Sequence, residues 1–210
     1  MQIVLCGATG EMGRRVLAEA LDRGHTVTAL VRDPARLDVS HQRLTVVVGE
    51  VRDRQAVAAV IAGQDAVVSC IGPGRLDGNL DVLSAGMSSI LAGMLASGVQ
   101  RIVAVGGAGI LQENEETLLH DTPGFPPMLR AISEEHLRAY ELLRASGTRW
   151  TMVCPPMFAS GEGSGGYRAE RDYLPEGGTQ IARADVALFM LDDLESGAFI
   201  GSRVGISDGL

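Results

Sequence analysis

The chain has 210 residues, and the 46% that are hydrophobic are enough for one domain with a sizeable core, which excludes a disordered chain. Its formal net charge of −8 argues against a nucleic-acid partner, and its apolar stretches are shorter than the roughly 20 residues that a membrane-spanning helix needs. All 18 basic residues are arginines, so lysine general bases, lysine Schiff bases and a Walker lysine are excluded.

Apolar runs and helical patterns alternate along the chain. We expect helices at 11–23, 53–62, 78–97, 133–146 (capped by Ser133) and near 183–195. Strands are expected at 2–6, 26–31, 44–48, 65–70, 100–105, 149–154 and near 203–207. Because the strands are continuously apolar and joined by helices, they predict an α/β fold, a doubly wound parallel sheet with helices on both faces.

One domain is expected to span residues 1–210. The segments 106–132 and 155–180 are rich in glycine and proline, and they should leave the carboxyl ends of the strands as active-site loops.

The chain enters its first strand at once, which favours a cytoplasmic location. Its three cysteines, Cys6, Cys70 and Cys154, include no CxxC pair and are expected to be reduced and buried.

A glycine triplet follows the first strand, in Gly7-Ala8-Thr9-Gly10-Glu11-Met12-Gly13. The first glycine allows a sharp turn, the second lets the backbone approach a pyrophosphate, and the third lets helix and strand pack closely. The following helix offers free N–H groups to the phosphates. Because the triplet lies between a strand and a helix, it predicts dinucleotide binding. We therefore expect residues 1–210 to form one NAD(P)-binding Rossmann domain with a small C-terminal substrate lobe.

The end of the second strand bears on the choice of cofactor. Arg32 stands where NAD-binding proteins usually carry an acid, so it can meet the 2′-phosphate of NADP, and Arg36 can close over the adenine as a second cation. Asp33 keeps NAD possible. The sequence favours NADP(H), with NAD(H) as the alternative.

Blocks in the same order and spacing resemble the atypical short-chain dehydrogenases, specifically the group of NADPH-dependent flavin reductases and biliverdin-IXβ reductases. The resemblance rests on the glycine turn and on residues 30–37, 46–51, 63–67, 101–104, 135–138, 142–147 and 155–156. It implies that Glu50 and Val51 lie beside the adenine, that Cys70, Ile71 and Gly72 follow the ribose, and that Pro155 and Pro156 face the nicotinamide. The predicted cofactor-binding residues are Gly7, Thr9, Gly10, Glu11, Met12, Gly13, Arg32, Arg36, Glu50, Val51, Cys70, Ile71, Gly72, Gly106, Gly107, Cys154, Pro155, Pro156 and Met157. The residues expected to contact substrate are Gly109, Leu129, Met157 and Phe158.

The chain departs from this group where chemistry is concerned. Gly106-Gly107-Ala108-Gly109 stands where the family often has a hydroxyl, and Met157 stands where a histidine can follow the two prolines. No Tyr-x-x-x-Lys is present. His136 and Tyr140, spaced i and i+4 on one helix face, are the candidate catalytic residues, and the four histidines are not spaced as a metal-ligand set.

A site of this kind suits hydride transfer to a flat, conjugated acceptor, which needs proximity and stacking more than a strong acid. We therefore expect an NADPH-dependent reductase of a flavin, tetrapyrrole or quinone-like molecule. Two alternatives stay open: an NmrA-like NADP-binding regulator without turnover, and an epimerase or dehydratase acting on a sugar nucleotide. The expected partner is a small-molecule acceptor, and the expected assembly is a monomer or a small homo-oligomer.

Overall fold

The computed structural model describes residues 1–73 and 79–209. Its main sheet has the strand order β3-β2-β1-β4-β5-β6-β10-β8. All neighbouring strands are parallel except β8, which runs antiparallel to β10 at the edge. The strands are β1 (Gln2–Cys6), β2 (Thr26–Val31), β3 (Leu44–Val48), β4 (Ala66–Ser69), β5 (Arg101–Val105), β6 (Arg149–Cys154), β8 (Tyr167–Arg171) and β10 (Ser202–Asp208).

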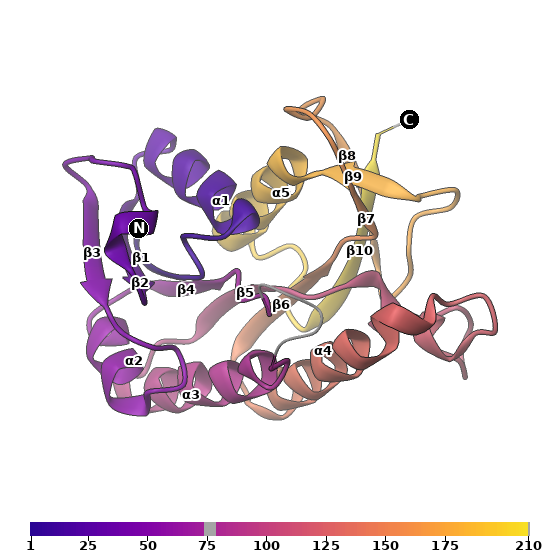
Figure 1. The fold of residues 1–210 in the computed structure, drawn as a ribbon, viewed down its shortest axis with the longest axis horizontal. Coiled ribbons are helices and arrows are strands. Elements are labelled where there is room, and N and C mark those ends of the chain that lie inside the picture. Colours follow the sequence, from indigo (N-terminus) through magenta and orange to yellow (C-terminus); the bar gives the residue numbers. More distant parts are fainter. Residues whose placement is uncertain (74–78, 210) are drawn as a thin grey trace.

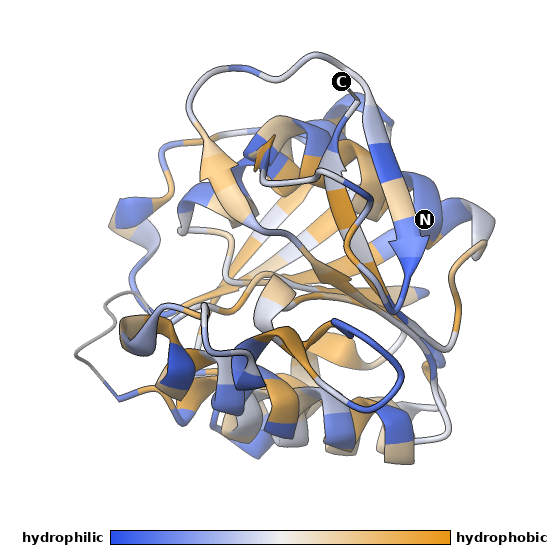
Figure 2. Cartoon of the chain, turned by 90° about the vertical axis from the view of Figure 1, so that its right-hand side faces the viewer, coloured by the Kyte–Doolittle hydropathy of each residue, from blue (hydrophilic) through white to orange (hydrophobic). Residues whose placement is uncertain are grey.

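Helices cover both faces of this sheet, as the alternation of strands and helices predicts (Figure 1). One face carries α1 (Glu11–Asp22) and α5 (Arg183–Ser196), and the other carries α2 (Arg54–Ile61), α3 (Val82–Ser97) and α4 (Pro127–Ala145). Each face has its own apolar core, and Figure 2 shows mostly hydrophobic strands between helices that mix hydrophobic and hydrophilic residues. The fold is therefore the doubly wound α/β fold that the sequence predicts.

The start of α4 differs from the sequence-based expectation. The helix begins at Pro127, and Ser133 lies inside it, with its Oγ 2.8 Å from Nδ1 of the buried His120. The prediction that Ser133 caps this helix is therefore wrong. Proline is favoured at the first position of a helix, where its missing N–H and fixed φ cost nothing, so Pro127 opens the helix in a stretch that looked like loop.

The segment 155–180 is also more regular than expected. It contains β7 (Met157–Ala159), the antiparallel strand β8, and then β9 (Gln180–Ala182), which pairs with β7 in a separate two-stranded sheet. The expected helix at 78–97 begins at Val82, and its first expected residue lies outside the described residues. Short 3-10 turns, η1 (Pro34–Arg36), η2 (Ala108–Ile110) and η3 (Leu119–Asp121), complete the loops.

Candidate functional site

The glycine turn connects β1 to α1, and two of its glycines are required by the protein itself. Gly7 has φ of +87°, and a Cβ on it would lie 2.3 Å from the carbonyl oxygen of Cys70. A Cβ on Gly13 would lie 2.1 Å from the carbonyl oxygen of Gly7. Larger residues at Gly7 or Gly13 would therefore collide with backbone, as expected for a tight turn that packs against its helix.

Gly10 has a different role from its two neighbours. Its backbone is extended, and a Cβ there would have only one neighbour within 4 Å, the carbonyl oxygen of Gly7 at 3.4 Å. Nothing in the described part of the chain therefore demands a glycine, and the described residues leave the space in front of Gly10 open. Among the described residues, the N–H groups of Glu11, Met12 and Gly13 have no acceptor. An open space facing free N–H groups at a helix start fits a pyrophosphate.

The region after β2 carries the residues predicted to choose the cofactor. Arg32 precedes η1, Arg36 is the last residue of η1, and both are exposed. The Asp33 carboxylate accepts a hydrogen bond from Ala35 N at 3.0 Å, so it caps η1. Sequence reasoning missed Arg14 of α1, whose guanidinium donates to the carbonyl oxygens of Thr9 and Arg36. Arg14 therefore ties the glycine turn to the Arg36 loop, a link between segments that no sequence spacing reveals.

The residues predicted beside the adenine and ribose converge on the carboxyl ends of β3 and β4. Val51 and Ile71 side-chain atoms both lie 3.1 Å from the place that a Cβ of Gly86 in α3 would take. Glu50 lies 3.8 Å from Arg52 and keeps about a third of its side chain exposed. The backbone of Cys70 and Ile71 lies directly against Gly7. Cys70 and Ile71 thus lie against the glycine turn, and Val51 and Ile71 meet at Gly86.

The predicted nicotinamide region lies where β5 and β6 end. Gly106 N donates to Val153 O at 2.7 Å, and Ala108 N donates to Pro155 O at 3.0 Å, so the glycine run and the double proline lie side by side. A Cβ on Gly107 would lie 3.4 Å from Cδ2 of His136, which places this imidazole beside the run. The two loops and one of the two candidate catalytic residues therefore meet at this edge.

Burial lowers the pKa of His136 to about 4, although the nearby Glu135 carboxylate acts in the opposite direction. The imidazole is consequently neutral near pH 7 and is a poor proton donor there. Tyr140 lies on the same helix but packs elsewhere: its ring stands edge-on to Trp150 at 5.7 Å, and the Arg203 guanidinium covers it at 4.6 Å. His136 therefore does not have the environment of a strong acid, and Tyr140 is held between Trp150 and Arg203.

The predicted substrate residues differ in how open they are. Met157 and Phe158 of β7 are 66% and 36% exposed, whereas Leu129 is half-buried and Gly109 is buried against Phe125 and Ser133. Tyr167, which lies in the expected active-site loop 155–180, packs against Phe189 and donates to Asp192 Oδ2 at 2.6 Å. Only Met157 and Phe158 among these residues offer an open apolar surface.

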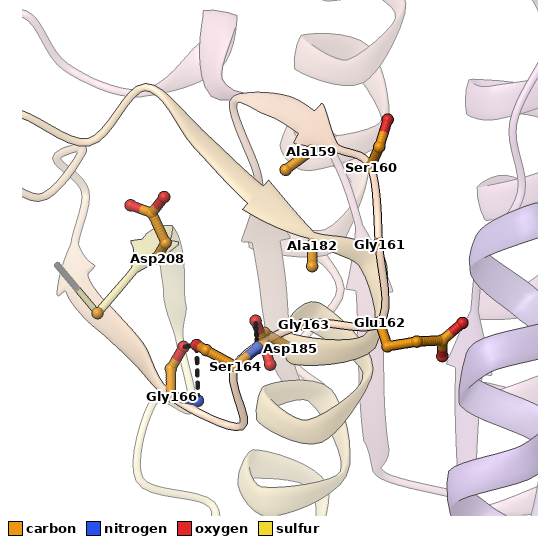
Figure 3. A pocket seen from close by; sticks show the side chains of 11 residues that line it. Ala159, Ser160, Gly161, Glu162, Gly163, Ser164, Gly166, Ala182, Asp185 and Asp208 are labelled. Carbon is orange, nitrogen blue, oxygen red and sulfur yellow. Dashed lines mark hydrogen bonds between the residues drawn. The ribbon is translucent and has the colours of Figure 1, made fainter.

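A loop of residues 160–166 joins β7 to β8 and borders a cavity of about 560 Å³ (Figure 3). The buried Asp185 carboxylate holds the loop from within, accepting from Ser164 N at 3.0 Å and Gly165 N at 2.8 Å. Glu162 extends toward α1, where it pairs with Arg15 at 2.6 Å. The loop is thus tied both to α5 and to the helix that follows the glycine turn.

The three cysteines are buried and unbonded, as expected. Burial raises the pKa of Cys6 and of Cys154 to about 12 and raises that of Cys70 still further, so none forms a thiolate near neutral pH. Within residues 1–73 and 79–209, no group of three or more His, Cys, Asp or Glu side chains is placed to hold a metal ion. In the same part of the chain, no helix is long and apolar enough to cross a membrane.

Comparison with known proteins identifies relatives of this chain. The family model for NAD(P)H-binding proteins matches residues 7–196. The protein YwnB of Bacillus subtilis (strain 168) is 32% identical over 203 residues, which cover 93% of this chain and 92% of YwnB. Two solved structures are each 30% identical and cover 99% of this chain. One is a candidate NADH-flavin reductase from Streptococcus pneumoniae TIGR4, with 99% of its own chain covered and a TM-score of 0.86. The other is a candidate epimerase from Bacteroides thetaiotaomicron, with 96% covered and a TM-score of 0.87.

Proposed function

This chain belongs to the NAD(P)H-binding family, and on that premise we propose that it transfers hydride from NADPH to a planar, conjugated acceptor such as a flavin, a linear tetrapyrrole or a quinone. The family and the reductase among its structural neighbours support an NAD(P)H-dependent reductase. The acceptor class and the preference for NADPH are inferred from this chain's own residues.

The observation that carries the proposal is that the described residues place no strong acid beside the predicted nicotinamide position. The run Gly106–Gly109 has no side-chain hydroxyl, and the nearest imidazole, His136, is neutral because burial lowers its pKa. Reduction of a ketone develops charge on oxygen and benefits from a placed proton donor. A conjugated acceptor spreads that charge over its rings, so proximity and stacking suffice.

The remaining side chains suit a flat molecule. The exposed Met157 and Phe158 follow directly after the double proline and provide an apolar surface, although one face of the Phe158 ring is covered by Arg183. A bound nicotinamide dinucleotide would supply the hydride from its nicotinamide ring. The chain would bind the pyrophosphate of the dinucleotide at the start of α1. The chain's own contribution is therefore to hold cofactor and acceptor in contact and to exclude water between them.

The preference for NADPH rests on charge at the end of β2. The Asp33 carboxylate accepts a hydrogen bond from Ala35 N and so caps η1. It is therefore poorly placed to accept from a ribose 2′-hydroxyl. Arg32 and Arg36 are exposed, and Arg14 adds a third cation bound to the Arg36 carbonyl. Three guanidinium groups around one loop favour a ligand with a 2′-phosphate.

The test is the oxidation of NADPH by the pure protein with FMN, riboflavin, a quinone and a linear tetrapyrrole supplied in turn. Turnover with at least one of them is expected. The variants His136→Ala and Tyr140→Phe should each lower kcat by less than roughly 10-fold, against the 10²–10⁴-fold typical of a lost general acid. Because His136 is already neutral, its removal should not change the pH profile between about pH 6 and pH 8.

Two results would contradict this proposal. A loss of activity of more than about 100-fold in His136→Ala or Tyr140→Phe would reveal a dedicated proton donor and favour a carbonyl substrate. Tight NADPH binding without turnover of any acceptor would favour the NmrA-like regulator. An epimerase is disfavoured because Tyr140 is followed at i+4 by Arg144 and its ring is covered by Arg203.

A further inference from the structure

Arg183 links the starts of two helices. It is the first residue of α5, and its Nη2 lies 2.8 Å from Oε2 of Glu11, the first residue of α1. Glu11 directly follows Gly10, so this ion pair stands beside the open space and the free N–H groups of the dinucleotide turn. About a third of the Arg183 side chain is exposed, which leaves it accessible from that space.

A cavity of about 520 Å³ lies alongside the first turns of α1 and contains three arginines among its lining residues. Two of them have partners outside it: Arg14 donates to Thr9 and Arg36 carbonyls, and Arg15 forms a two-point contact with Glu162 at 2.6 and 3.0 Å. Arg183 is paired with Glu11, which is itself part of the lining. Arg183 is therefore the arginine best placed to change partners within the cavity.

The charge of Glu11 is otherwise hard to reconcile with a phosphate site. A carboxylate in the first turn of a helix is favourable when that end is empty, but it repels a pyrophosphate placed at the same N–H groups. An arginine that neutralises the carboxylate and also faces the phosphates removes this conflict. Its planar fork of donors suits a phosphate oxygen pair.

The position of the guanidinium is also fixed from a second side. It stacks over the Phe158 ring, with 4.2 Å between Cζ and the ring centroid. Stacking on an aromatic face holds the plane of an arginine without using its N–H donors. Glu11 is the one polar partner of Arg183 among the described residues, so the N–H donors that do not face Glu11 stay available for a ligand.

We propose that Arg183 binds the pyrophosphate of the dinucleotide, exchanging its contact with Glu11 for one with a phosphate oxygen. The proposal rests on the nicotinamide cofactor that the family binds and not on the identity of the acceptor. Arg183 would act on NADP and NAD alike, because both carry the same pyrophosphate. This separates it from Arg32 and Arg36, which would act on the 2′-phosphate alone.

The test is calorimetric titration of NADP⁺, NAD⁺ and adenosine 2′-monophosphate, which has no pyrophosphate. Arg183→Met should weaken both dinucleotides by roughly 10- to 100-fold, as for a lost charge-assisted contact, and should leave the monophosphate within about twofold. Glu11→Gln should tighten both dinucleotides, because it removes the repelling charge and the competing partner of Arg183. Arg183→Lys should fall between wild type and Arg183→Met.

The matched control is Arg130→Met, which removes an exposed arginine from α4 that pairs with Asp121 at 3.6 Å. It should change none of the three affinities. Unchanged dinucleotide binding in Arg183→Met overturns the proposal, and so does weaker binding in Glu11→Gln, which would mean that the ion pair only holds α1 and α5 together. If Arg183→Met unfolds at a much lower temperature than the wild type, its loss of affinity is not informative. The affinity of Glu11→Gln for the two dinucleotides then decides whether Arg183 binds the pyrophosphate. If the wild type binds neither dinucleotide, both the proposed cofactor and the role of Arg183 are wrong. If it binds them without reducing any acceptor, only the proposed acceptor is contradicted.

Discussion

At the scale of single residues, the three glycines of the turn differ in why they are needed: Gly7 and Gly13 for packing, and Gly10 for the predicted dinucleotide. Gly13→Val would drive a side chain into the carbonyl of Gly7, so we expect a protein that is poorly folded. Gly10→Val meets only one atom at van der Waals distance, in a backbone conformation that any residue adopts, so the fold should persist. The valine would then fill the space predicted for the pyrophosphate and abolish dinucleotide binding.

Circular dichroism, thermal unfolding and titration with NADPH distinguish the two variants. Gly10→Val should keep the wild-type spectrum and melting temperature while losing affinity. A folded Gly10→Val protein with wild-type affinity would show that the pyrophosphate lies elsewhere, and a misfolded one would show that this glycine serves packing as Gly13 does.

Arg32 provides a second prediction at this scale. Arg32→Ala should weaken NADPH binding by about 1.5–3 kcal/mol and leave NADH binding nearly unchanged, because only NADPH carries the 2′-phosphate. The exposed Arg54 at the start of α2 offers a matched control, since its removal should alter neither affinity. The measurement is the ratio of the two dissociation constants. An equal loss for both cofactors would rule out Arg32 as the discriminating residue, and Arg36 and Arg14 would be tested next.

At the scale of elements, sequence patterns predict the helices and strands whose formation depends on the local order of apolar and polar residues. They miss the strands that form only by pairing with segments distant in sequence. The long buried strands and α1 appear where their apolar runs and spacing predict them. The strands β7, β8 and β9 carry mixed, partly exposed residues, so they have no periodic signal and exist through pairing with partners distant in sequence. The start of α4 is missed for a different reason: residues 106–132 are rich in glycine and proline, a composition typical of loops, and it does not reveal that Pro127 takes the first position of a helix.

The candidate site divides in the same way. The glycine turn and the double proline are local motifs, and the structure brings the predicted residues around them together. Arg14 and Arg183 could not be found from spacing, because their contacts with Arg36 and Glu11 cross 22 and 172 positions of the chain. For His136, the sequence supplies the residue but not its burial, and burial decides that its imidazole is neutral.

At the scale of the whole molecule, one buried ion pair joins the sheet to the helix layer that carries Arg183. Arg101, at the start of β5, lies 2.6 Å from Asp193 of α5, and both side chains are almost fully buried. The guanidinium also donates to Thr151 Oγ1 at 2.9 Å, and Asp193 Oδ1 accepts from Phe199 N at 2.7 Å. Burial lowers the pKa of Arg101, yet its charge is retained because the carboxylate acts in the opposite direction.

Breaking this pair from one side should cost more than removing it altogether. Arg101→Met leaves a buried carboxylate without its cation, so the free energy of unfolding should fall by about 3–5 kcal/mol. The double variant Arg101→Met/Asp193→Leu replaces both charges by apolar groups and should be more stable than Arg101→Met alone, since no unpaired charge stays buried. Urea unfolding at neutral pH measures both, with Arg130→Met as the surface comparison expected to cost less than about 1 kcal/mol. If the double variant is no more stable than Arg101→Met, the pair stabilises the fold through its hydrogen bonds to Thr151 and Phe199 rather than through matched charge, and α5 would depend on those bonds for its place on the sheet.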